Sequence, residues 1–129
     1  MQNLLMLVGR ILLAAIFVWA GYGKIEAYAG TQAYMASQGV PGALLPLVIL
    51  LELGGGIAII LGFFTRLTAF ALAAFCVASA LLFHSNVAEQ MQAILFMKNL
   101  AMAGGFLVLA AHGPGDISLD NRHSRPAYD

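Results

Sequence analysis

Charged side chains are scarce in this sequence of 129 residues, which holds six basic and six acidic residues. They make up 9% of the chain, against 61% hydrophobic residues, whereas soluble domains carry about 25% charged residues. A soluble protein of this size could not bury so much apolar surface, so the composition indicates a membrane protein. The formal net charge is zero and the basic residues form no patch, so we expect the lipid bilayer rather than nucleic acid as a partner.

Cysteine is almost absent, because Cys76 is the only one in the chain. A single cysteine excludes an internal disulfide and any metal site built from several cysteines. The sequence also lacks a haem-ligand pair, an iron–sulfur motif, a nucleotide-binding loop and a catalytic triad. We therefore expect no metal site, and no redox centre formed by the chain's own residues.

Long apolar runs dominate what remains, and four of them have about the 20 residues that a transmembrane helix needs. They cover residues 4–22, 44–64, 67–83 and 93–111. The sequence therefore predicts an all-α integral membrane protein, with an antiparallel four-helix bundle in residues 1–112 and a polar tail in residues 113–129. The first run follows no basic residue and is interrupted by Arg10, which favours a retained helix over a signal peptide.

The connections between the runs differ in length. Residues 24–43 contain an apolar stripe at helical spacing and then the sequence GVPG, which predicts a short interfacial helix between residues 26 and 38. An ordinary connecting helix and a lid over a pocket both fit this loop. The tail opens with GPG, which ends the fourth helix, and its polar composition predicts a loosely held segment.

Orientation follows from the basic residues outside the membrane. Arg66, Arg122 and Arg125 fall on the side of the two termini, and Lys24 alone falls on the other side. We therefore expect a multi-pass protein of the bacterial inner membrane with both termini in the cytoplasm.

Three charged residues interrupt the apolar runs, namely Arg10, Glu52 and Lys98. Each would cost about 2.5–3.5 kcal/mol at the centre of a bilayer, so they should face the bundle interior and pair. Counting about 1.5 Å of rise per residue places Lys98 nearly level with Glu52, and Arg10 deeper from the opposite face. We expect Glu52 to pair with Lys98, and failing that with Lys24 or Arg10.

Two interpretations of these charges remain open. They could form a structural clasp between helices, or they could line a polar cavity in which Glu52 and Lys98 move protons or hold a polar ligand. Intramembrane ionisable residues are functional candidates by default. Asn99 and His84 would add hydrogen-bond donors at the same level.

The same residues, in this order and spacing, resemble the DoxX family of small membrane proteins along nearly the whole chain. The resemblance starts with Gly9-Arg10 and AGYGKI, continues with LLELGGGIAIILGFFTR, and ends with FMKNLAMAGGFLVLAAHGPGDISLD. It extends to inner-membrane proteins of the enterobacterial type within that family.

The resemblance implies one function and leaves another open. Because DoxX relatives include subunits of a thiosulfate:quinone oxidoreductase, it implies a quinone as cofactor and a redox partner subunit. Lys98 or Arg10 would then donate hydrogen bonds to the quinone, with Glu52 relaying the proton; the other candidate cofactor contacts are Lys24, Asn99 and His84. The alternative is a non-enzymatic scaffold or accessory subunit with structural charges. The sequence therefore leaves open whether the chain is an enzyme, and a homo-oligomer is compatible with either function.

Overall fold

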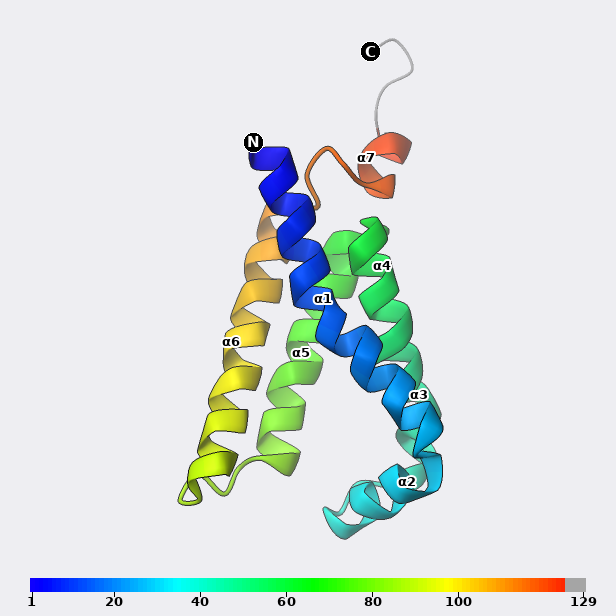
Figure 1. The fold of residues 1–129 in the computed structure, drawn as a ribbon, viewed down its shortest axis with the longest axis vertical. Coiled ribbons are helices and arrows are strands. Elements are labelled where there is room, and N and C mark those ends of the chain that lie inside the picture. The colour runs from blue at the N-terminus through cyan, green and yellow to red at the C-terminus, as the bar shows by residue number, and fades with distance from the viewer. Residues whose placement is uncertain (125–129) are drawn as a thin grey trace.

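The computed structural model describes residues 1–124, with side chains to residue 121, and this part of the chain is helical throughout its regular structure (Figure 1). Four helical segments are long and apolar enough to cross a membrane: Gln2–Glu26, Gly42–Leu61, Thr65–Phe83 and Gln90–His112. They confirm the predicted all-α fold with four spans. The observed segments begin and end within four residues of the predicted runs.

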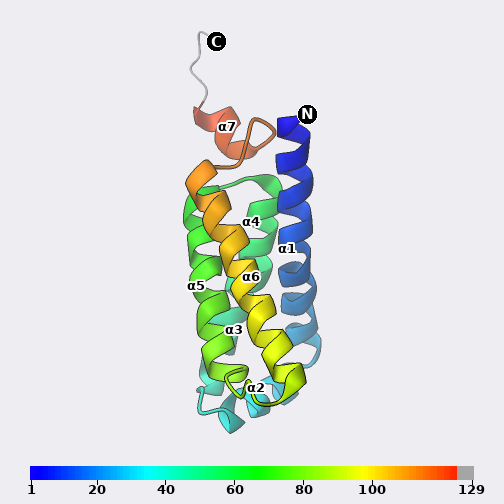
Figure 2. The same cartoon turned by 90° about the vertical axis from the view of Figure 1, so that its left-hand side faces the viewer.

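The first span is the single helix α1 (Gln2–Glu26), and the second is built from several pieces. The second span begins with a short 3-10 turn, η1 (Gly42–Leu44), and continues as α3 (Leu45–Ile49), the π-turn η2 (Leu50–Gly54) and α4 (Gly55–Leu61). Helices α5 (Thr65–Phe83) and α6 (Gln90–His112) form the third and fourth spans. Figures 1 and 2 show α5 and α6 side by side along their length, and α1 packs on the second span.

The two helix pairs meet in a core of small and aromatic side chains. Phe17 of α1 and Phe106 of α6 are in edge-to-face contact, with ring centroids 5.3 Å apart. Ile59 and Leu72 are fully buried beside them. This core lies between the middle and the tail-bearing end of the bundle, so it leaves space between the pairs at the other end.

Glycine allows α1 to approach the second span closely. A Cβ atom on Gly21 would lie 2.9 Å from the backbone nitrogen of Leu53, and one on Gly56 would lie 2.9 Å from Cγ2 of Val18. Real Cβ atoms essentially never approach other heavy atoms so closely, so any larger residue would push the helices apart. Small residues at such contacts are typical of membrane helices.

The predicted helix in the first loop is present as α2 (Tyr28–Ser37). It follows α1 after Ala27 and ends just before Gly39, whose φ of 79° is readily adopted only by glycine. The Tyr34 ring stacks on Phe83 of α5 at a centroid distance of 5.5 Å. Figure 1 shows α2 across the end of the bundle away from the N-terminus; its position at a membrane interface remains a prediction.

The segment after α6 folds back onto the bundle, so the expectation of a loosely held tail is wrong for residues 116–121. Ser118 is buried, the backbone nitrogen of Asp120 donates to the carbonyl of Gly62 at 2.8 Å, and Asn3 donates to the Asp116 carboxylate at 3.0 Å. Helix α7 (Leu119–Ser124) then lies at the same end as the N-terminus (Figure 1). Of the residues used to predict orientation, Arg125 and the side chain of Arg122 lie outside the described part.

Candidate functional site

The polar residues predicted from the sequence divide into two clusters at opposite ends of the bundle. Five of the six line one cavity near α2: Lys24, Glu52, His84, Lys98 and Asn99. Arg10 belongs to a second cluster, close to the returning tail. The two clusters therefore need separate explanations.

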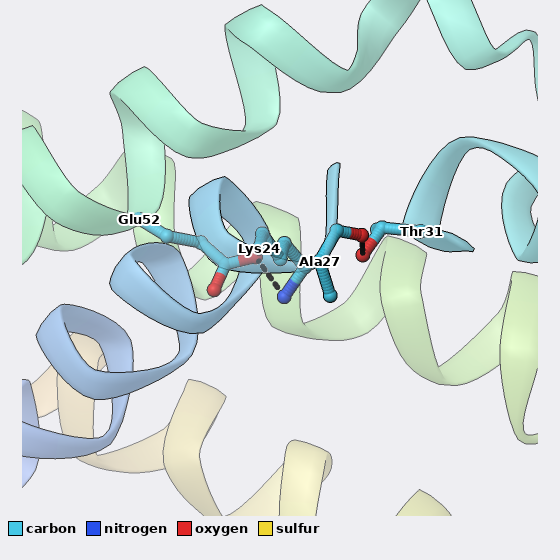
Figure 3. A network of polar contacts seen from close by, with 4 residues as sticks. All are labelled: Lys24, Ala27, Thr31 and Glu52. Atoms are coloured by element: carbon cyan, nitrogen blue, oxygen red, sulfur yellow. Dashed lines mark hydrogen bonds and ion pairs between the residues drawn. The ribbon is translucent and has the colours of Figure 1, made fainter. Parts of the chain in front are cut away.

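The buried carboxylate of Glu52 pairs with Lys24. The Lys24 Nζ atom lies 2.8 Å from Glu52 Oε1, and the Glu52 side chain is 3% exposed (Figure 3). The expectation that Lys98 would be the first partner of Glu52 is therefore wrong, while the second choice, Lys24, is confirmed.

Helix packing explains why Lys24 is the partner. Gly21 lies one turn before Lys24 and touches Leu53, the neighbour of Glu52, so Lys24 and Glu52 share the contact between α1 and the second span. Lys98 stands on α6, in the other helix pair, and lines the cavity that Glu52 also lines. The estimate of depth along the bundle axis therefore ranked Lys98 and Lys24 in the wrong order as partners of Glu52, because it took no account of which helices are neighbours.

Glu52 occupies the π-turn η2 (Leu50–Gly54) within the second span. Single π-turns inside α-helices are uncommon and are frequent at functional sites. The sequence analysis missed this turn. The available signal was the sequence ELGGG, in which three glycines that begin two residues after the acid lower the helix propensity.

The cavity between the two helix pairs has a volume of about 440 Å³. Asn99 is buried there, and His84 at the end of α5 places Nδ1 2.9 Å from Oε1 of Gln92. Helix α2 closes part of the wall with Thr31, Tyr34 and Met35. The rest of the lining is largely apolar and includes Ile16, Phe17, Val48, Phe75, Leu82 and Met102.

Arg10 lies in the second cluster and does not line this cavity. Its side chain is 2% exposed, and Nη2 donates to the carbonyl of Ile117 at 2.5 Å. A Cβ atom on Gly62 would collide with Nη1 of Arg10 and with Ser118, so glycine leaves the space that the guanidinium occupies. Arg10 also interacts electrostatically with Asp120. These contacts give Arg10 a structural role in holding the returning tail.

The second cluster also caps two helices. Both carboxylate oxygens of Asp120 accept hydrogen bonds at 2.7 Å, from the backbone nitrogens of Phe64 and Thr65 at the start of α5. Arg66 in turn donates to the carbonyls of Ala111 at 3.0 Å and His112 at 3.2 Å, at the end of α6. These caps satisfy backbone groups that a helix terminus leaves unpaired. We call the hydrogen bonds of Asp120 at the start of α5, together with those of Arg66 at the end of α6, the Asp120 latch.

The sequence analysis missed the Asp120 latch. An N-capping acid normally precedes its helix by one residue, whereas Asp120 lies 55 residues after Thr65. The only signal was that Gly62, Arg66, Ser118 and Asp120 stand in the stretches that carry the family resemblance.

Two bacterial inner-membrane proteins are similar to this chain over most of its length. The chain is 56% identical to inner membrane protein YqjF of Escherichia coli over 120 residues, which cover 93% of the chain and 92% of that protein. It is 39% identical to inner membrane protein YphA of the same organism, over 94% of the chain and 91% of that protein. No solved structure matches the chain. The DoxX family model matches residues 5–85, from α1 to the end of α5, and the chain therefore belongs to the DoxX family.

Proposed function

We propose that this DoxX protein resides in the bacterial inner membrane as the quinone-binding subunit of a membrane oxidoreductase. The observation that carries the proposal is the cavity, which combines an intramembrane acid–base pair with two further donors inside a largely apolar wall. The names of the two relatives support the inner-membrane location. A redox partner subunit would supply the electrons.

The cavity fits a quinone in size and in chemistry. Its volume of about 440 Å³ falls within the 300–1,000 Å³ of typical ligand pockets, which are mostly apolar with a few polar groups. A quinone is a flat ring with two carbonyl oxygens that need donors, and it carries an apolar tail. The Lys98 ammonium and the Asn99 side-chain amide supply donors on adjacent residues of α6.

In this proposal the residues that line the cavity have different roles. Lys98 and Asn99 bind and orient the carbonyl oxygens, and the aromatic and aliphatic wall excludes water. Glu52 and Lys24 both line the cavity and contact each other, so this pair is placed to exchange a proton with a bound ligand. The quinone, when bound, supplies the redox chemistry, for which the described side chains offer no centre.

The proposal is tested by purifying the protein in a neutral detergent and measuring bound quinone by mass spectrometry. We expect quinone in amounts comparable to protein, and about tenfold less in Lys98→Met, because a hydrogen bond from a charged donor is lost. Asp116→Asn, at the opposite end, is the matched control and should retain the quinone. Quinone at the level of an unrelated membrane protein prepared in parallel would overturn the proposal.

A non-enzymatic accessory subunit is the second candidate, and the Lys24–Glu52 contact supports it. This pair joins α1 to the second span, as a structural clasp would. This alternative predicts two results. The Lys24→Met, Glu52→Gln double variant should still assemble with the partner complex, and the protein should contain no bound quinone.

A further inference from the structure

We propose that the cavity selects an amphiphile whose headgroup carries one negative charge, held by Lys98. The inference rests on the proposed function in one respect, namely that the cavity is a ligand site. It adds the charge of the headgroup, which applies equally to an ionised hydroxyquinone and to a long-chain carboxylate.

The first step of the argument is the charge of the cavity. Three charged side chains line it, and Lys24 and Glu52 neutralise each other at 2.8 Å. Lys98 is left as an excess positive charge. No other acid in the sequence stands inside a span: Glu26 and Glu89 stand at helix ends, and the three aspartates follow α6.

The second step is the position of Lys98. It follows the start of α6 by eight residues, about 12 Å along the helix axis, so its backbone lies within the span. Its neighbours one turn away are Ile94, Leu95, Ala101 and Met102, which offer no countercharge. In the described part of the chain, Lys98 forms no hydrogen bond or ion pair, and its side chain remains accessible.

The third step is energetic. An unpaired cation within a bilayer is costly, and such residues pair with a countercharge or line a polar cavity. An anionic headgroup would remove this cost at Lys98, while a neutral headgroup would leave most of it. Asn99, which is buried next to Lys98, would donate a second hydrogen bond to the same headgroup.

The fourth step concerns the tail. Apolar side chains from four spans form most of the rest of the cavity wall, and burial of hydrocarbon against them is favourable. The arrangement therefore fits a molecule with a small anionic head and a hydrocarbon chain.

The experiment compares two pairs of probes by thermal shift in a neutral detergent, over a range of ligand concentrations. One pair is an alkylated 2-hydroxy-1,4-naphthoquinone, ionised at neutral pH, and its uncharged methyl ether. The other pair is dodecanoate and dodecanol. We expect the wild-type protein to bind the charged member of at least one pair about tenfold more tightly than the neutral one.

The variants assign the preference to Lys98. Lys98→Gln should abolish the preference and Lys98→Arg should retain it, as should Arg122→Gln, which removes a positive charge from a residue outside the four spans. Equal binding of charged and neutral members by the wild type would overturn the inference, as would an unchanged preference in Lys98→Gln. If Lys98→Gln does not fold, the wild-type comparison and Lys98→Arg still decide.

The two proposals fail in distinguishable ways. Binding of both naphthoquinones, with equal affinity for the charged and neutral members of each pair, would leave the quinone function standing and remove the selection for charge. Binding of dodecanoate but of neither naphthoquinone would support the selection for charge and remove the quinone function.

Discussion

Glu52 is almost fully buried, and its carboxylate depends on a single basic neighbour, Lys24, for its ion pair. A buried ion pair contributes little net stability compared with apolar residues of the same volume, but loss of one partner strands the other charge. The pair can therefore be removed as a unit at much lower cost than either member alone. This difference between the double and single variants can be used to distinguish a structural clasp from a functional role of Glu52.

We expect Glu52→Gln and Lys24→Met each to lower the free energy of unfolding, by up to about 3 kcal/mol. The double variant should be less destabilised than the sum of the two, with a coupling of roughly 1 kcal/mol or more. Denaturant titration in detergent measures all three. The combination of Glu52→Gln with Lys98→Met is the control, and should be additive.

The same variants also decide what the pair does. If the double variant recovers both stability and quinone retention, the pair is a structural clasp. If it recovers stability but lacks proton-coupled activity, Glu52 takes part in the function. Additive losses from Glu52→Gln and Lys24→Met would contradict the contact itself.

The sequence predicted which residues form the site, but it did not predict which of them pair. The cost of a charge in lipid identified Glu52, Lys98 and Arg10 as inward-facing, and the structure buries both Glu52 and Arg10. The partner of Glu52 could not be ranked, because sequence gives depth along a helix but not which helices are neighbours. The role of Arg10 was missed because its partner is the backbone carbonyl of Ile117, which no side-chain pattern reveals.

At the scale of elements, the contact between α1 and the second span depends on Gly21. Gly21→Ala would place a methyl group 2.9 Å from the Leu53 backbone, so we expect a loss of about 1–3 kcal/mol from overpacking, visible as a lower melting temperature. Gly23→Ala is the matched control two residues along the same helix. It meets nothing within 4 Å and should be neutral, or stabilising by about 0.5–1 kcal/mol. Equal effects of the two substitutions would exclude a close contact at Gly21.

The Asp120 latch makes a second prediction at this scale. Asp120→Ala removes both hydrogen bonds to the start of α5 and should cost about 0.5–2 kcal/mol, as loss of an N-cap does. Asp116→Ala removes an exposed hydrogen bond from Asn3 and should change stability by less than about 0.5 kcal/mol. Unfolding of the two variants side by side measures the difference, and a larger loss in Asp116→Ala would refute the capping role.

Run length and turn residues predicted the elements themselves. The four apolar runs gave the spans, and GVPG gave the end of α2, because both are local features. The π-turn at residues 50–54 and the docking of residues 116–121 were missed. The first depends on how the backbone packs, and the second depends on contacts between residues far apart in sequence.

At the scale of the whole molecule, the N-terminus and α7 lie at one end and α2 lies at the other (Figure 1). The basic residues predict that the end with the termini is cytoplasmic. A fluorescent reporter that folds only in the cytoplasm should therefore be bright when fused to the C-terminus. A periplasmic phosphatase reporter should be active when inserted after residue 87, between α5 and α6. The reverse pattern would invert the orientation.

The order of synthesis gives the Asp120 latch a further consequence. Fifty-five residues separate Thr65 from Asp120, and ribosomes add about 5–20 residues per second. The start of α5 therefore waits roughly 3–11 s for Asp120, and Arg10, which precedes Ile117 by 107 residues, waits roughly 5–21 s. During that interval α5 and α6 are still being synthesised, and α6 (Gln90–His112) ends only eight residues before Asp120. A chain that stops before residue 120 lacks the acceptor for the backbone nitrogens of Phe64 and Thr65, so the start of α5 would keep two unpaired donors.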